Sequence, residues 1–93
     1  MNRELIRSTA FIRTARRHLK KHPQAAEILQ ATLLLLSEDA FDPRLKTHKL
    51  RGDLDGVWAC SAGYDLRILF ELVQHEGAEA ILLLTMGTHD EVY

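Results

Sequence analysis

The chain has 93 residues, enough for one small domain around a single hydrophobic core. Apolar residues make up 46% of it and charged residues 27%, which excludes a disordered chain, and no apolar run approaches the roughly 20 residues that cross a bilayer. A formal net charge of −1 does not by itself indicate nucleic-acid binding. The single cysteine, Cys60, excludes an internal disulfide. We therefore expect one domain over residues 1–93, cytoplasmic by default and without a membrane partner.

The N-terminal half predicts a short strand followed by two helices. Arg3 to Ser8 can form the strand, and apolar residues then recur at helical spacing, at Phe11, Ile12, Ala15 and Leu19. Pro23 interrupts this helix, because proline fits the first turn of a helix but not its interior. A second amphipathic helix begins near Pro23 and ends within Ser37 to Pro43. Two consecutive helices of this kind indicate a helical hairpin.

The C-terminal half changes to a strand pattern punctuated by glycines. We expect strands at Leu54 to Ser61, Asp65 to Gln74 and Ala80 to Met86, with a tight turn over His75 to Gly77. Successive strands joined by short turns form an antiparallel meander. The fold class is therefore α+β, with an N-terminal strand and a two-helix hairpin packed on a twisted antiparallel sheet.

Alternation along the middle strand predicts which side chains are buried. One face carries Leu66, Ile68, Phe70 and Leu72, which should pack against the helices. The other face carries Asp65, Arg67, Leu69 and Glu71. We expect this second set to line an open and partly polar face, with Arg67 beside Asp65.

Positive charge is concentrated in two stretches, although the chain as a whole is near neutral. Arg3 to Lys21 holds seven basic residues against Glu4 alone, and "RLKTHKLR" adds four more with His48. These patches could contact RNA phosphates, or they could be solvated faces that keep the protein soluble. The candidate contacts to RNA or to the ribosome are Arg13, Arg16, Arg17, Lys20, Lys21, Arg44, Lys46, Lys49 and Arg51.

Five groups suited to proton transfer, charge stabilisation or base stacking come together in this plan: His48, Asp65, Arg67, His89 and Tyr93. The histidines are too scattered for a metal site, and no glycine-rich phosphate loop or nucleophile elbow is present, so no metal or cofactor is expected. Cys60 falls within a strand pattern and is predicted to be a buried, inert thiol. The other histidines, His18, His22 and His75, are assigned to solvated helix or turn positions.

The sequence resembles the toxins of the RelE/ParE superfamily, and most closely the YafQ-like branch that cleaves messenger RNA. The resemblance spans nearly the whole chain, and its parts are His-x-Leu-x-Gly at 48–52, Asp-Leu-Arg-Ile at 65–68 and the closing Gly-Thr-His at 87–89. It implies ribonuclease activity on messenger RNA engaged by the ribosome, and a cognate antitoxin protein as partner. By position, His48, Asp65 and His89 match functional residues of the YafQ-like motif, Tyr93 matches the aromatic near its end, and Arg67 matches the strand arginine of RelE-like members.

One position departs from the YafQ-like pattern. Where those toxins place a second histidine on the preceding strand, this chain has Ser61, which does not act as an acid or base near neutral pH. Two alternatives therefore stay open beside messenger-RNA cleavage. One is a ParE-like toxin that inhibits a topoisomerase, since one fold can serve several functions. The other is a catalytically degenerate binding module of the same fold.

Overall fold

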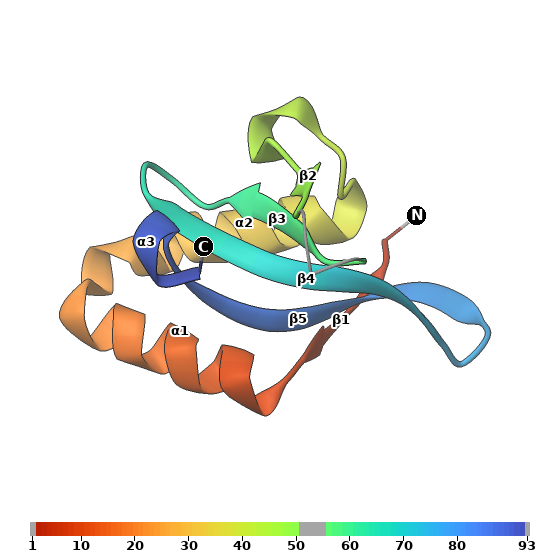
Figure 1. Ribbon diagram of the computed structural model, residues 1–93, viewed down its shortest axis with the longest axis horizontal. Helices are drawn as coiled ribbons and strands as arrows, with labels where there is room; N and C mark the ends of the chain where they lie inside the picture. The colour runs from red at the N-terminus through yellow and green to blue at the C-terminus, as the bar shows by residue number, and fades with distance from the viewer. Residues whose placement is uncertain (1, 51–55, 93) are drawn as a thin grey trace.

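The computed structural model describes residues 2–50 and 56–92 (Figure 1). The element order begins with strand β1, a hairpin of two long helices, and a short strand, and ends with three strands and a single helical turn. Their bounds are β1 Glu4–Arg7, α1 Thr9–Lys21, η1 Pro23–Ala25, α2 Ala26–Glu38, η2 Pro43–Leu45, β2 His48–Lys49, β3 Trp58–Ser61, β4 Leu66–His75, β5 Ala78–Thr88 and α3 His89–Val92. No helix in these ranges is long and apolar enough to cross a membrane.

The five strands form one sheet in the order β1-β5-β4-β3-β2. The expected antiparallel meander of β3, β4 and β5 is confirmed, and β2 pairs antiparallel with β3. β1 runs parallel to β5, with Glu4 opposite Ala80 and Arg7 opposite Leu83, so the sheet is mixed and not wholly antiparallel as expected. The sequence alone contains no signal for this long-range pairing.

The helix boundaries follow from local chemistry. Ser8 caps α1, since its hydroxyl accepts a 3.0 Å hydrogen bond from the Phe11 backbone N–H. Pro23 begins a single 3₁₀ turn, and α2 starts directly after it at Ala26. The expected helical hairpin with a break at Pro23 is thus confirmed.

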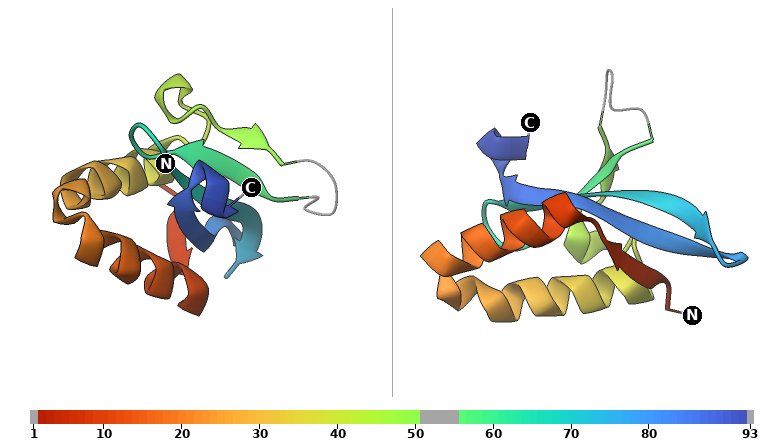
Figure 2. Two further views of the ribbon diagram at one scale, coloured as in Figure 1. Left: turned by 60° about the vertical axis from the view of Figure 1, so that its left-hand side comes forward. Right: turned by 90° about the horizontal axis from the view of Figure 1, so that it is seen from below.

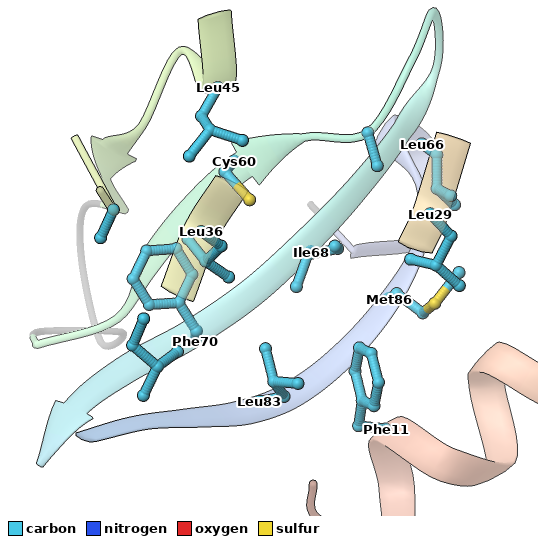
Figure 3. Close-up of a cluster of buried hydrophobic side chains, with 13 residues drawn as sticks. Phe11, Leu29, Leu36, Leu45, Cys60, Leu66, Ile68, Phe70, Leu83 and Met86 are labelled. Carbon is cyan, nitrogen blue, oxygen red and sulfur yellow. The ribbon is translucent and has the colours of Figure 1, made fainter. Parts of the chain in front are cut away.

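The main core lies between the helical hairpin and one face of the sheet (Figure 2). Phe11, Leu29 and Leu36 enter it from the helices, and Ile68 and Phe70 enter it from β4 (Figure 3). Ile68, Phe70 and Leu36 have no exposed surface, as the alternation along β4 predicts for the first two. Each fully buried side chain of this size stabilises the fold by about 1.5–3 kcal/mol through the hydrophobic effect.

The opposite face of the sheet is less open than the sequence predicts. Leu69 is only 6% exposed and forms a small second core with Val57 and Ala59, which Leu50, Leu84 and Val92 partly cover. The pairing of β4 with β5 is irregular between Leu69 and Phe70, where β5 contributes one extra residue. The expectation that Leu69 lines an open face was therefore wrong. We call this side, away from α1 and α2, the outer face.

Candidate active site on the outer face

Arg67 lies on the outer face, near the end of the sheet that carries α3. In the sheet register it is opposite Ser61 of β3 on one side and opposite Gly87 of β5 on the other. Its side chain is half-buried, and a guanidinium N–H donates a 3.1 Å hydrogen bond to the Leu66 carbonyl oxygen. Arg67 is therefore a positive charge held on the sheet, with the small Ser61 beside it on β3, whereas Glu91 and Val92 of α3 lie over Gly87 on the other side.

His48 borders the same face from the neighbouring edge strand. The sequence predicts a loop here, but His48 pairs with Ala59 in the short strand β2. The ring Nδ1 lies 3.0 Å from the Lys46 carbonyl oxygen. Two strand spacings of about 4.8 Å and two residue steps of about 3.3 Å put the Cα atoms of His48 and Arg67 roughly 12 Å apart. A phosphodiester group can lie between two side chains at that separation.

His89 approaches from the other end of the face, at the first position of α3. Its backbone N–H donates a 3.1 Å hydrogen bond to the Asp65 carbonyl oxygen, and its exposed ring places Nδ1 3.6 Å from Asp90 Oδ1. The helical turn α3 was not predicted from the sequence. It explains Gly87, because a Cβ there would lie 3.0 Å from Glu91 Oε1 and 3.1 Å from Glu91 Cβ.

Asp65 lies just before β4 and is exposed. It borders a cleft at the end of the sheet together with His18, His22 and Tyr64. The ion pairs found among residues 2–50 and 56–92 do not include one between Asp65 and Arg67. A catalytic role for Asp65 stays a prediction. Tyr93 and Arg51 lie outside the described residues, so their predicted roles stay predictions as well.

The basic residues fall into two groups, and two members of the second group contact other side chains. Those of α1 that we expect to contact RNA, Arg13, Arg16, Arg17, Lys20 and Lys21, are all exposed. In the second group, Arg44 forms a 3.0 Å ion pair with Asp42, and this pairing holds the pKa of the Asp42 carboxyl below its ordinary value. Lys49 lies over the Trp58 ring, with Nζ 5.4 Å from its centroid. Lys46, exposed, adopts a left-handed conformation with φ 53°.

Two histidines that the sequence assigned to solvated positions border the cleft next to Asp65. The rings of His18 and His22 lie one helical turn apart with centroids 4.9 Å from each other. Burial lowers the pKa of His18 below its ordinary 6.5, the neighbouring His22 lowers it further, and Glu91 opposes the shift. The i, i+4 spacing of the pair was visible in the sequence. Their exposure to a cleft depends on the fold and was not.

The remaining candidates are consistent with an acid/base site rather than a thiol site. Cys60 is fully buried in the main core, and burial raises the pKa of its thiol to about 12, which confirms the expected inert cysteine. Within the described ranges, no three side chains of the His, Cys, Asp or Glu types are grouped so that they could hold a metal ion.

Several solved structures with the same fold are bacterial toxins. The E. coli DinJ–YafQ toxin–antitoxin complex matches with a TM-score of 0.77 and 17% identity, over 100% of this chain and 99% of that one. A YoeB/ParE toxin from Agrobacterium tumefaciens matches with 0.76 and 13%, over 92% and 98%. A copper-bound mutant toxin from Helicobacter pylori matches with 0.74 and 22%, over 100% of both chains. At these identities the likeness shows the fold. A search of the curated proteins found no match.

The chain therefore has the α+β fold of these solved toxin structures, with polar side chains on its outer face. Residues 3–93 match the family described as bacterial toxin of type II toxin–antitoxin system, YafQ. The chain belongs to this family, which confirms the resemblance seen in the sequence.

Proposed function

We propose that this protein is a toxin that cleaves messenger RNA, on the ribosome and without a metal cofactor, and that an antitoxin holds it inactive. The observation that supports this proposal best is the position of Arg67 on the outer face near the end of the sheet, with His48 on one side and His89 on the other. A cation between two imidazoles is the set of groups that RNA transesterification needs.

The reaction assigns one role to each group. The ribose 2′-oxygen attacks the adjacent phosphorus and loses its proton to a base, for which His48 is the first candidate and Asp65 the second. Arg67 stabilises the charge that grows on the phosphorane oxygens. His89 donates a proton to the 5′-oxygen as the P–O bond breaks, which leaves a 2′,3′-cyclic phosphate and a 5′-hydroxyl. Imidazoles suit both proton transfers, because their unperturbed pKa of roughly 6.5 lies near neutral pH.

The bases next to the scissile phosphate need a surface to stack on, and Tyr93 is proposed for that role. The exposed cations of α1, together with the basic residues of the 44–51 segment, are proposed to contact RNA phosphates or the ribosome.

The decisive experiment compares two histidines at opposite ends of the β4–β5 hairpin (Figure 1). Primer extension on transcripts should show discrete cuts after induction of the wild-type protein. His89→Ala should lower the cleavage rate about 10²- to 10⁴-fold, the usual contribution of a positioned proton donor. His75→Ala, in the turn region at the far end, should cleave like the wild type. Equal rates for the two variants would refute the assignment of His89.

Ser61 favours one competing function. It sits directly opposite Arg67, where a second proton carrier would be most useful, and its hydroxyl does not titrate near neutral pH. A ParE-like toxin that inhibits a topoisomerase needs no acid/base pair at this position. Growth arrest with intact transcripts and blocked DNA supercoiling would support that function, and absence of both effects would indicate a binding module.

A further inference from the structure

A two-part cleft lies at one end of the molecule, beside the proposed active site. The larger hollow, of about 410 Å³, separates the α1–α2 turn from the β3–β4 turn. The smaller one, of about 140 Å³, separates α1 from α3. His18, His22 and Thr88 border both hollows, so the two lie side by side. All of these segments gather at the same end of the fold in both views (Figures 1 and 2).

The larger hollow has the chemistry of a nucleobase site. Its floor is apolar, from Ala25, Ile28, Ala62 and Leu66, and aromatic rings of His18, His22 and Tyr64 stand around it. Tyr64 is 100% exposed, which is unusual for an aromatic residue, because aromatic side chains normally pack against other residues. A volume of about 410 Å³ falls in the range of roughly 300–1,000 Å³ typical of small-ligand sites.

The backbone of the β3–β4 turn is shaped to keep this hollow open. Gly63 has φ +94°, a conformation that other residues rarely adopt, and a Cβ there would lie 3.4 Å from Ile28 Cγ2. That distance is an ordinary van der Waals contact, so it is the positive φ that requires glycine in this turn, and the next residue, Tyr64, is fully exposed. The exposed Tyr64 ring therefore lies at the rim of the cleft.

The smaller hollow has the charge of a phosphate site. Arg17 and Lys21 border it from one face of α1, and the opposing acid is Glu91. The Glu91 carboxylate is engaged by the Thr88 backbone N–H at 2.7 Å. Two exposed cations therefore face one carboxylate that already has a donor. At about 140 Å³ the hollow holds a phosphate group but not a second base.

We propose that this cleft binds one guanine nucleotide of the RNA strand, with the base in the larger hollow and a phosphate in the smaller one. Guanine is selected because Asp65, at the edge of the larger hollow, carries a carboxylate that accepts hydrogen bonds, and in this assignment His48 and not Asp65 is the general base. The N1–H and N2–H₂ groups of guanine are adjacent donors that match the two oxygens of the carboxylate, whereas adenine, cytosine and uracil do not present two adjacent donors on that edge. The inference rests on the proposed RNA cleavage, since it names the base that the site reads next to the cut.

The test is a titration of the wild-type protein with 5′-GMP, followed by NMR of the histidine rings. The signals of His18 and His22 should shift and saturate, while those of His75 at the far end should stay in place. 5′-AMP, 5′-CMP and 5′-UMP should bind more weakly. Guanosine should bind more weakly than 5′-GMP, and Lys21→Gln should narrow that difference in affinity, because Lys21 contacts only the phosphate while Arg17 remains.

Aromatic variants separate stacking from a general loss of structure. Tyr64→Ala should weaken 5′-GMP binding by about 5- to 150-fold, the range for a stacked base, and Tyr64→Phe should bind like the wild type. Phe41→Ala is the matched control, because Phe41 is also an exposed aromatic (47%) but packs edge-on against Trp58 at the sheet edge. Its affinity should be unchanged. No saturable shift at millimolar 5′-GMP, or no effect of Tyr64→Ala, would overturn the proposal.

Two outcomes distinguish this inference from the proposed function. Binding of 5′-GMP by a protein that leaves transcripts uncut would refute RNA cleavage and support the cleft as a nucleotide site. Cleavage of transcripts without binding of 5′-GMP would refute the cleft assignment alone. If the antitoxin shifts His18 and His22 while 5′-GMP leaves them unchanged, the cleft is a protein-docking surface and the proposal is wrong.

Discussion

The backbone N–H of Thr88 donates a 2.7 Å hydrogen bond to the carboxylate of Glu91, three residues further along the chain. This contact is one of the two hydrogen bonds of a capping box, and it stabilises the N-terminus of the four-residue helix α3. The same hydrogen bond is the main reason that the pKa of Glu91 lies below its ordinary 4.5, and the nearby Arg17 and His18 add to the effect. The proposed proton donor His89 sits between the two bonded residues, so Glu91 fixes the start of the turn that carries it.

Glu91→Ala should therefore lower RNA cleavage by roughly 10- to 100-fold, because small misplacements of a reacting group carry rate losses of that order. Glu91→Gln keeps an oxygen that accepts from Thr88 and should retain most of the activity. Glu76→Ala, at an exposed turn of the far hairpin, is the charge-matched control. The measurement is the cleavage rate together with the melting temperature of each variant. A fully active Glu91→Ala would mean that α3 does not position His89.

His18 should make the stability of the protein depend on pH. Its pKa is lowered in the folded state by burial and by His22, so the unfolded chain binds more protons below about its ordinary 6.5. The contribution of neutral His18 to the free energy of unfolding is fully present above pH about 6.5. It is lost as the pH falls through the lower pKa that His18 has in the folded state. Urea midpoints at pH about 7.5 and about 5.5 should differ less for His18→Gln than for the wild type. His75→Gln, in contrast, should keep the wild-type difference.

The local elements were readable from the sequence because they depend on neighbouring residues. Pro23 and the alternation along β4 predicted the break between the helices and the buried face of the strand with no need of distant contacts, whereas the capping role of Ser8 was not predicted. The parallel pairing of β1 with β5 joins residues some 76 positions apart, such as Glu4 and Ala80, and no local pattern encodes it. The burial of Leu69 likewise required α3 and the segment around Leu50 to fold over the outer face.

The candidate site divides in the same way. Residue types suited to proton transfer pointed to His48, Arg67 and His89, and the register shows which strands carry them. The sequence missed the cleft of His18 and Tyr64, since its walls come from two turns that are distant along the chain. Thr88 and Glu91 fit the T-x-x-E pattern of a capping box, so α3 could have been found from the sequence.

Cys60 should resist alkylation in the native state. Its side chain has no exposed surface, and a pKa of about 12 leaves almost no reactive thiolate at neutral pH. Iodoacetamide at pH about 8 should label the protein slowly in buffer and rapidly in denaturant, as mass spectrometry can follow. Rapid labelling of a sample whose circular dichroism is native would show that the β3 edge opens without global unfolding.

Thr14 joins α1 to the strand edge that β1 leaves uncovered. β1 pairs with β5 only as far as Leu83, and the next stretch of β5 runs beside α1. There the Thr14 hydroxyl accepts a 3.2 Å hydrogen bond from the Met86 backbone N–H, while it can donate to the Ala10 carbonyl oxygen at 2.9 Å. One side chain thus satisfies a backbone donor of β5 that has no partner on a neighbouring strand.

Thr14→Val keeps the shape of the side chain but leaves the Met86 N–H without its acceptor. The loss of such a partner in a partly buried place costs about 1–3 kcal/mol, which should appear as a lower urea midpoint with an unchanged slope. Thr14→Ser restores the hydroxyl and should recover most of the stability, a comparison that isolates the hydrogen bond from packing. Hydrogen exchange should report the same contact locally. The Met86 amide proton should exchange slowly in Thr14→Ser and rapidly in Thr14→Val. Equal protection in both variants would mean that α1 covers this edge by packing alone.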